Sequence, residues 1–338
     1  MKIHAPLSWQ ETLNEVLERR PRRLLILGGV DVGKSTLAHY LLQGLVEQGL
    51  RVALVDADVG QKEVGPPATV GLRHFEKVLP ASCPWEAERL YFVGSTTPVG
   101  HLLPLVVGTK LLCDQAQADV TLINTTGLIR GPGLALKTYK IEALAPELIV
   151  ALQRENELEA ILSGFRHLAI KRLEVSPLSR TKNFAERKQR REEAYRQHFA
   201  QAHRVTLSLD KLVVQRRPRQ WRRNLLCAVA NQKRILALAI LEEYDLAQGR
   251  VTLFTPANPY EIRILICGSL YVSRLGEELG KVRPRRATPP SGRPHTRPAS
   301  SPPRETPARP RSPRLGRKLW KKRSLPGPKD RTAPEKGE

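Results

Sequence analysis

Short apolar runs alternate with longer amphipathic segments through the first half of the chain. The runs lie at residues 24–27, 51–55, 90–93, 120–123, 148–152 and 170–175. Each has the length and composition of a buried strand. Between the first two runs, residues 36–45 carry Leu37, Leu41 and Leu45 at helical spacing. This alternation over residues 22–175 predicts an α/β fold with a mostly parallel sheet and helices on both faces. Ligands of such sheets bind at the carboxyl ends of the strands.

A glycine-rich loop follows the first apolar run and precedes the predicted helix. Its pattern is Gly-x4-Gly-Lys-Ser, which directs backbone N–H groups and a helix N-terminus at a polyphosphate. The predicted nucleotide-binding residues are Gly28, Gly29, Val30, Asp31, Val32, Gly33, Lys34, Ser35 and Thr36. We expect Lys34 to neutralise the β- and γ-phosphates and the Ser35 hydroxyl to ligate Mg²⁺. A glycine turn that binds nothing is the alternative.

The pattern changes after residue 204. Residues 205–280 lose the helical spacing and contain strand-like segments at 235–241, 250–255 and 262–270. We therefore expect a P-loop domain over residues 1–204, a small β-rich domain over 205–280 and a tail over 281–338.

The tail differs from the rest in composition. It carries 18 Lys and Arg against 4 Asp and Glu, and 13 of the 27 prolines of a chain whose net charge is +23. Such a segment cannot bury enough apolar surface to offset its chain entropy, so we expect it to be disordered. It could bind nucleic acid non-specifically, or it could be a solubilising extension without a partner. The remainder of the chain is also basic.

The cysteine spacing and the hydropathy of the chain indicate the cellular compartment. Cys83, Cys113, Cys227 and Cys267 lie far apart without a C-x-x-C pair, which argues against a zinc site and a secreted disulfide framework. Charges run through the N-terminal residues, so no signal peptide is expected, and no apolar stretch is long enough to span a membrane. We expect a cytoplasmic protein with reduced thiols and no membrane partner.

Polar side chains follow several predicted strands. Asp56 and Asp58 come after the second strand at a spacing that places both on one side of the sheet, where one suits Mg²⁺ and the other suits proton abstraction. Turn residues that cap a loop are the alternative. Asn124 ends another strand at a position where P-loop hydrolases carry an aspartate, which shifts the acidic role to Asp56 and Asp58.

A hydroxyl-rich turn follows the run at 90–93. It contains Ser95, Thr96, Thr97 and Pro98, and it could bind a phosphodiester or cap the helix after it. The residues alone favour the cap.

Four motifs in order, GGVDVGKST, VDADVGQ, VGSTTP and INTTGLIRGPG, resemble the Clp/Grc family of polynucleotide 5′-hydroxyl kinases over roughly residues 9–280. The resemblance implies that ATP, with Mg²⁺, phosphorylates the 5′-hydroxyl of RNA or DNA. It implies that Asp58 is the general base, within an element ending at Gln61. Gln61 is then expected to bind the polynucleotide. Thr96, Thr97 and Pro98 look like the family's clasp on the substrate's first nucleotides, which reverses the preference for a cap.

The family also closes an arginine-bearing lid over the phosphates, and residues 180–199 resemble it. When the segment is aligned from Phe199, Arg191 and Arg196 match the catalytic arginines of the lid. Because the segment and the family's lid differ in length by a couple of residues, Arg187 or Arg190 could serve instead. Guanidinium groups suit the charge that develops during phosphoryl transfer. A solvated basic helix is the alternative for this segment.

Two other functions compete with an active polynucleotide kinase. The chain could be a catalytically silent ATP-binding scaffold in RNA processing, although Lys34, Asp58 and the arginines argue for activity. It could also be a P-loop enzyme that acts on small molecules, against which the basic composition and the clasp-like turn argue.

Overall fold

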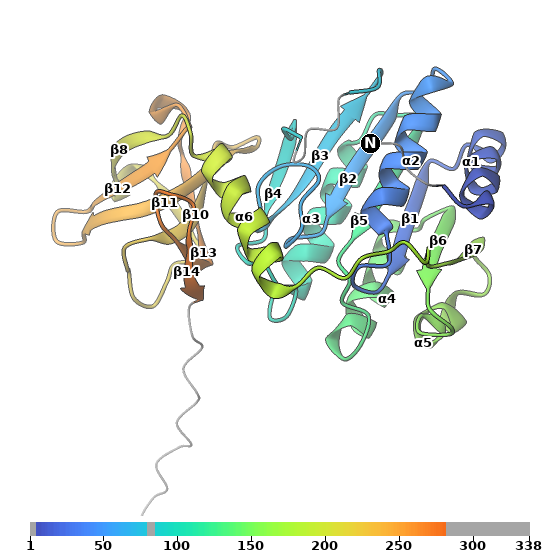
Figure 1. Ribbon diagram of the computed structural model, residues 1–338. Coiled ribbons are helices and arrows are strands. Elements are labelled where there is room, and N and C mark those ends of the chain that lie inside the picture. Colours follow the sequence, from blue (N-terminus) through green and yellow to red (C-terminus); the bar gives the residue numbers. More distant parts are fainter. Residues whose placement is uncertain (1–4, 80–84, 282–338) are drawn as a thin grey trace, which may run out of the picture. The chain divides into compact units, whose positions relative to one another are not determined.

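The structure is a computed structural model, and it describes residues 5–79 and 85–281. The predicted tail lies outside the described residues except for Lys281, and so does Cys83. The first sheet has the strand order β4-β3-β2-β5-β1-β6-β7 (Figure 1). Its strands are β1 (Arg23–Gly28), β2 (Val52–Ala57), β3 (Thr69–Phe75), β4 (Arg89–Phe92), β5 (Val120–Thr125), β6 (Leu148–Gln153) and β7 (Ile170–Glu174).

Helices cover both faces of this sheet, as predicted. One face packs against α1 (Leu7–Arg19) and α2 (Lys34–Glu47). The other packs against α3 (Leu102–Gln115), α4 (Pro132–Leu144) and the short α5 (Glu159–Leu162), which a 3₁₀ turn (Ser163–Phe165) follows. Side chains alternate between the two cores because successive strand residues point to opposite faces. In β1, Leu24 and Ile26 join the first core, whereas Leu25 and Leu27 join the second.

Most of the sheet is parallel, which confirms the predicted fold class. β2, β5, β1, β6 and β7 pair in parallel with one another in that order. β3 is the exception, because it pairs antiparallel with both β2 and β4. The sequence analysis missed β3. Its residues TVGLRHF include a glycine and three polar side chains, so they form no continuous apolar run.

The expectation that residues 90–93 and 170–175 form buried strands is correct as to strand and wrong as to burial. β4 and β7 form the two edges of the sheet, so each has a neighbour on one side only. Arg89 in β4 and Arg172 in β7 are exposed. Edge strands carry charged side chains because these discourage pairing with other chains. An apolar run alone does not distinguish an edge strand from a central one.

The second sheet confirms the predicted β-rich part. The strand order is β14-β13-β10-β11-β12-β8, and β9 pairs with β13. The strands are β8 (His203–Ser208), β9 (Val213–Gln215), β10 (Leu225–Ala230), β11 (Ile235–Asp245), β12 (Arg250–Thr255), β13 (Ile264–Val272) and β14 (Glu278–Lys281). Two 3₁₀ turns lie at Leu209–Lys211 and Pro259–Glu261.

A shared core joins the second sheet to the rest of the chain. Helix α6 (Phe184–His198) precedes the sheet (Figure 1), and its Tyr195 packs with Phe199 against buried residues of β10, β11 and β13. Phe92, the last residue of β4, lies in the same cluster. His198 Nε2 accepts a hydrogen bond from the Leu238 N–H at 3.1 Å, and burial lowers the pKa of His198 to about 4. The domain boundary expected at residues 204/205 stays a prediction. The second sheet has a core of its own and also shares the cluster around Phe92 and Tyr195 with the preceding part of the chain.

Three described cysteines, Cys113, Cys227 and Cys267, are buried and free. In the described part of the chain no group of His, Cys, Asp and Glu has the arrangement of a metal centre. Among the described helices, none has the length and hydropathy to cross a membrane.

Helix α4 buries two lysines, and one of them has no partner. Lys140 has no exposed surface, and its Nζ has no hydrogen-bond partner among the described residues. Burial lowers the pKa of Lys140 to about 7 from the ordinary 10.5. Because an unpaired buried ammonium is unfavourable, Lys140→Met should raise the free energy of unfolding at pH 7 by about 1–3 kcal/mol.

The pH dependence of stability provides the check. Between about pH 7 and 10.5 the unfolded chain holds more protons on Lys140 than the folded chain does, so stability should rise with pH in this range. Urea denaturation at several pH values should show that Lys140→Met removes part of this rise. A variant that keeps the whole rise, or that is less stable at pH 7, would contradict the assignment.

Candidate functional site: a phosphate-binding loop facing a hydroxyl-rich turn

The loop between β1 and α2 has the form that the sequence predicts. Gly33 adopts φ 96° and immediately precedes α2, which begins at Lys34 without a side-chain cap. The uncapped helix start leaves backbone N–H groups available for an anion. Residues 29–36 line a cavity of about 770 Å³, and Gly28 ends β1 beneath it. This loop can bind the phosphates of a nucleotide.

Lys34 folds back on its own loop. Its Nζ donates a hydrogen bond to the carbonyl oxygen of Gly29, and the side chain is buried. Burial lowers the pKa of Lys34, and the carboxylates of Asp58, Asp31 and Glu157 oppose that shift. The ammonium is therefore close to negative charge but in a poorly solvated place, where an anion would stabilise its charged form.

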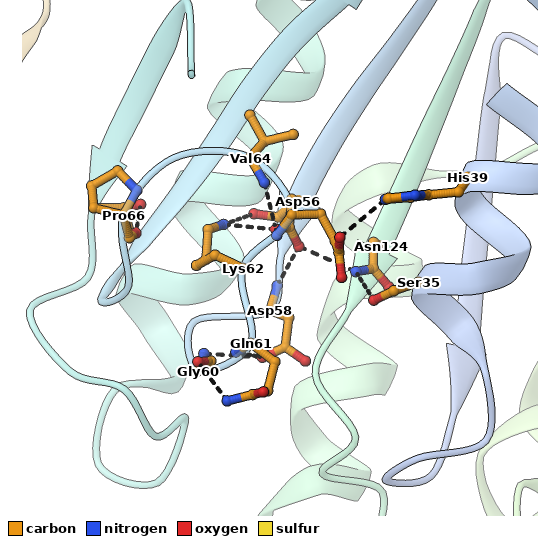
Figure 2. A network of polar contacts seen from close by, with 12 residues as sticks. Ser35, His39, Asp56, Asp58, Gly60, Gln61, Lys62, Val64, Pro66 and Asn124 are labelled. Carbon is orange, nitrogen blue, oxygen red and sulfur yellow. Dashed lines mark hydrogen bonds and ion pairs between the residues drawn. The ribbon is translucent and has the colours of Figure 1, made fainter. Parts of the chain in front are cut away.

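The carboxylate of Asp56 is fully buried and fully engaged (Figure 2). Its Oδ2 accepts hydrogen bonds from the N–H groups of Glu63 at 2.6 Å and Val64 at 3.2 Å, and it pairs with Lys62 Nζ at 3.1 Å. Its Oδ1 accepts from the Asp58 N–H at 3.1 Å. Burial raises the pKa of Asp56, and Lys62 opposes that shift. These contacts favour an indirect role for Asp56 at any metal, because its oxygens already have donors.

Asn124 connects Asp56 to the loop. Its Nδ2 donates to Asp56 Oδ1 at 3.2 Å and lies 3.3 Å from Ser35 Oγ (Figure 2). Among the described residues, Asn124 Oδ1 has no hydrogen-bond partner although it is buried, and the same is true of Thr126 Oγ1. Asn124 thus lies beside the predicted Mg²⁺ ligand Ser35, and Thr126 lines the same cavity as Ser35. Buried oxygen acceptors without a partner suit water or a hard cation.

The turn after β5 lies against the phosphate-binding loop. A Cβ on Gly127 would lie 2.7 Å from Val30 Cα and 2.8 Å from Val30 N, so only glycine fits there. Lys137 holds the same turn from α4, since its Nζ donates to Thr125 Oγ1 at 2.9 Å and to the Thr126 carbonyl. The sequence analysis missed Lys137. A lysine among the apolar residues of α4 was the available signal.

Asp58 lines the cavity and keeps one oxygen available. Its Oδ1 accepts hydrogen bonds from the N–H groups of Gly60 at 3.0 Å and Gln61 at 3.1 Å. Among the described residues its Oδ2 has no hydrogen-bond partner. The backbone bonds fix the side chain, so Oδ2 can accept a proton from a bound group without rearrangement of the loop.

The hydroxyl-rich turn faces the same cavity. Thr96, Thr97 and Pro98 line it together with Gln61 and the phosphate-binding loop. Helix α3 begins at Leu102 with His101 as its N-cap residue and no side-chain cap. The alternative in which the turn's hydroxyl groups cap this helix is therefore wrong.

Segment 180–199 places one arginine directly on the phosphate-binding loop. Helix α6 begins with a capping box between Asn183 and Glu186. Just before it, the Lys182 N–H donates to Asp31 Oδ2 at 2.9 Å, and Arg187 forms an ion pair with the same carboxylate oxygen. Gln61 Nε2 donates to the Arg187 carbonyl at 3.2 Å. Arg187, which the alignment ranked second, is thus the arginine that contacts the loop.

The two arginines that the alignment favoured have other partners. Arg191 lines the cavity and donates two hydrogen bonds of 2.7 Å to Glu278. Arg196 pairs with Glu193, is half exposed and does not line this cavity. A Cβ on Gly276 would lie 2.7 Å from the Arg196 backbone, so the second half of α6 packs tightly on the β13–β14 turn.

A family model described as mRNA cleavage and polyadenylation factor CLP1 P-loop matches residues 28–201. The chain belongs to this family. The match confirms the Clp/Grc resemblance that the four motifs carry.

Relatives of this Clp1-family chain carry informative names. It is 43% identical over 198 residues to the polyribonucleotide 5′-hydroxyl-kinase of Pyrococcus furiosus, covering 58% of this chain and 56% of that protein. It is 39% identical over 199 residues to the Methanocaldococcus jannaschii protein of that name, covering 58% and 55%. It is 29% identical over 214 residues to human polyribonucleotide 5′-hydroxyl-kinase Clp1, covering 59% and 50%. The chain spans about half the length of the curated relatives it matches.

A solved structure supports the fold over a longer span. The wild-type Clp1p–Pcf11p complex contains a chain that superposes with a TM-score of 0.65 at 12% identity, covering 80% of both chains. At this identity the similarity concerns the fold, including the second sheet.

The cavity of this Clp1-family chain gathers most of the residues expected from sequence. Lys34, Ser35, Asp58, Gln61, the turn at 96–98 and Arg191 all line it, whereas Asp56 and Arg196 do not. Arg130, Glu157 and Lys182 also line it, although none of them was among the site residues expected individually. Arg130 lies within the motif INTTGLIRGPG and Lys182 within the segment 180–199, but the motifs alone did not show that these side chains reach the cavity.

Gly127→Ala should weaken binding of a nucleoside triphosphate by about 10-fold or more. The added methyl must displace the backbone at Val30, and small displacements of a binding loop have large effects. Titration with a fluorescent triphosphate analogue would measure this. Gly164→Ala is the matched control, because its Cβ would meet nothing within 4 Å. Equal affinities of both variants and the wild type would refute the close approach.

Proposed function

We propose that this chain is an ATP-dependent polynucleotide 5′-hydroxyl kinase. The observation that carries the proposal is one cavity lined by the phosphate-binding loop, Asp58, the hydroxyl-rich turn and basic residues of segment 180–199. A donor site and an acceptor site in one cavity are what phosphoryl transfer requires. The names of the relatives agree with this proposal.

ATP would bind with its phosphates on the loop. The uncapped start of α2 and Lys34 supply the donors, and Lys182, Arg187 and Arg191 bring further positive charge to the same cavity. Cations in these places suit the oxygens of the transferred group, whose charge is redistributed in the transition state.

The residues present fit Mg²⁺. Ser35 Oγ is a hard oxygen ligand for the ion, and Asn124 beside it would act through water, which leaves the free Asp58 oxygen for the proton of the acceptor. Asp56 would act through Asn124, whose orientation it sets. When bound, the ion would neutralise charge on the β- and γ-phosphates.

Asp58 would activate the acceptor, because it lines the cavity with one oxygen available. It would take the proton of the 5′-hydroxyl as that oxygen forms its bond to the γ-phosphorus. The bond from the phosphorus to the bridging oxygen breaks, and ADP leaves with that oxygen. The turn at 96–98 would hold the first nucleotides so that the hydroxyl faces Asp58.

Lys34→Ala should lower the rate of phosphate transfer by at least about 100-fold, because it removes the cation at the phosphates. The measurement is transfer of labelled γ-phosphate to matched 5′-hydroxyl RNA, single-stranded DNA and duplex oligonucleotides. Lys110→Ala is a matched control, since Lys110 pairs with Asp114 on the surface of α3. A wild-type protein that labels none of these substrates would refute the kinase activity and favour an ATP-binding scaffold.

Asp58→Asn separates the base from the nucleotide site. The amide retains an oxygen acceptor for the N–H groups of Gly60 and Gln61 but cannot take a proton. Transfer should fall by about 100-fold to 10,000-fold while ATP affinity changes little. Single-turnover rates and equilibrium nucleotide titrations give the two quantities. A parallel loss of ATP affinity would assign Asp58 to the metal instead.

A further inference from the structure

The second sheet holds the turn that faces the acceptor side of the cavity. The region concerned runs from the end of β4 at Phe92 through the turn to His101. Arg216, which follows β9, donates from Nη1 to the carbonyl oxygens of Phe92 at 3.1 Å and Val93 at 3.0 Å. Arg216 adopts φ 52°, an uncommon backbone conformation for a residue other than glycine. A single side chain thus binds two successive backbone groups immediately before the turn.

Ser269 of β13 binds the next carbonyl along the chain. Its N–H and its Oγ donate to the carbonyl oxygen of Gly94 at 2.8 and 2.9 Å. His101 Nε2 lies 3.0 Å from the same Oγ. Since the hydroxyl proton points at Gly94, His101 must donate from Nε2 to Ser269. Burial and the neighbouring Arg216 lower the pKa of His101, which favours the neutral form of the ring.

The backbones meet so closely that two glycines are required. Gly94 has φ 85°, and a Cβ there would lie 2.9 Å from Gly268 Cα. A Cβ on Gly268 would lie 2.6 Å from the Leu226 carbonyl and 2.9 Å from Phe92. Because Phe92 is itself in the core that the second sheet shares, the end of β4 cannot shift without disturbing that core.

The opposite side of the turn contacts the nucleotide-binding half. The N–H groups of Val93 and Gly94 donate to the Ala68 carbonyl at 2.9 and 3.0 Å. The Thr96 carbonyl lies close to Gly60, where an added Cβ would approach it to 3.1 Å. The turn therefore lies between the loop that carries Asp58 and the second sheet, with contacts on both sides.

We propose that Arg216 and Ser269 are positioning residues for acceptor binding, which they support by fixing residues 94–98 at the cavity. This inference rests on the proposed function, in which Thr96, Thr97 and Pro98 grip the polynucleotide. It gives the β-rich part of the chain a role in the reaction. Neither side chain is among those that line the cavity, so both act through the turn.

The test compares two variants with a matched control. Arg216→Met removes the donors to Phe92 and Val93, and Ser269→Ala removes the hydroxyl bond to Gly94. Arg263→Met is the control, since Arg263 Nη1 likewise donates to two backbone carbonyls, those of Tyr260 at 2.8 Å and Ile262 at 2.9 Å. These lie within the second sheet's own turn.

We expect the variants to change the KM for the oligonucleotide but not the KM for ATP. The KM for a 5′-hydroxyl oligonucleotide should rise about 3-fold to 10-fold in Ser269→Ala and about 10-fold or more in Arg216→Met. The KM for ATP should stay within about 2-fold, and Arg263→Met should leave both unchanged. A role in folding alone would not separate the two substrates.

Hydrogen exchange of residues 93–101 provides a second measurement that does not depend on activity. Protection of these amides should fall in Arg216→Met and Ser269→Ala and be retained in Arg263→Met. Unchanged protection in both variants would overturn the inference whether or not the protein is a kinase. A wild-type protein that labels no oligonucleotide would contradict the proposed function and leave the exchange result to decide whether these residues hold the turn.

The variant Arg216→Lys tests whether Arg216 has a direct electrostatic role in binding the polynucleotide. If Arg216 acted as a cation for the polynucleotide, Lys would preserve the KM and Ser269→Ala would have no effect. Under the positioning role, Lys should retain only part of the affinity, because an ammonium lacks the planar group that bonds the two carbonyls.

Discussion

The burial of the Asp56 carboxylate is the constraint on which the site depends. A carboxylate removed from water is tolerated only if donors satisfy its oxygens, and here the donors are backbone N–H groups, Lys62 and Asn124. The backbone donors come from the loop after β2, so this loop must fold around Asp56. The same loop presents Asp58 and Gln61 to the cavity. Asn124 transmits the constraint to Ser35, and thus to the phosphate-binding loop.

The acceptor side depends on a different kind of interaction. Phe92, Tyr195 and Phe199 bury their rings among apolar residues of the second sheet, which attaches both the end of β4 and the second half of α6 to that sheet. Polar bonds from Arg216 and Ser269 then set the detail of the turn. Buried charge thus orders the loops after β1 and β2, and apolar packing positions the end of β4 before the turn at 96–98. The loop after β2 and this turn meet at Gly60 and Thr96.

The sequence predicts those parts of the site that depend on residues close together in the chain. The loop at 28–35 is recognisable because glycines and a lysine at this fixed spacing after an apolar run are typical of a phosphate-binding loop. Asp58 and the turn at 96–98 were found because polar residues follow strands, and their meaning came from family resemblance. β3 and the edge positions of β4 and β7 were not predictable, since strand order depends on pairings between distant residues. The partners of Arg187, Arg191 and Arg216 lie far away in the chain, at Asp31, Glu278 and Phe92.

The ion pair between Asp31 and Arg187 sets a condition on nucleotide binding. Asp31 belongs to the loop that binds phosphates, yet its carboxylate is nearly buried and paired with a guanidinium and a backbone N–H of segment 180–199. Any bond from Arg187 to a phosphate oxygen must therefore replace or share this ion pair. The free energy gained is then the difference between the attraction of Arg187 to the phosphate and its attraction to Asp31. The arginine needs no large movement to make that exchange, because its first anion lies on the same loop as the second. Arg187 would then exchange one anion for another over a short distance and would not have to be recruited from solvent. The competition with Asp31 then governs how strongly the position of Arg187 depends on the number of phosphates bound.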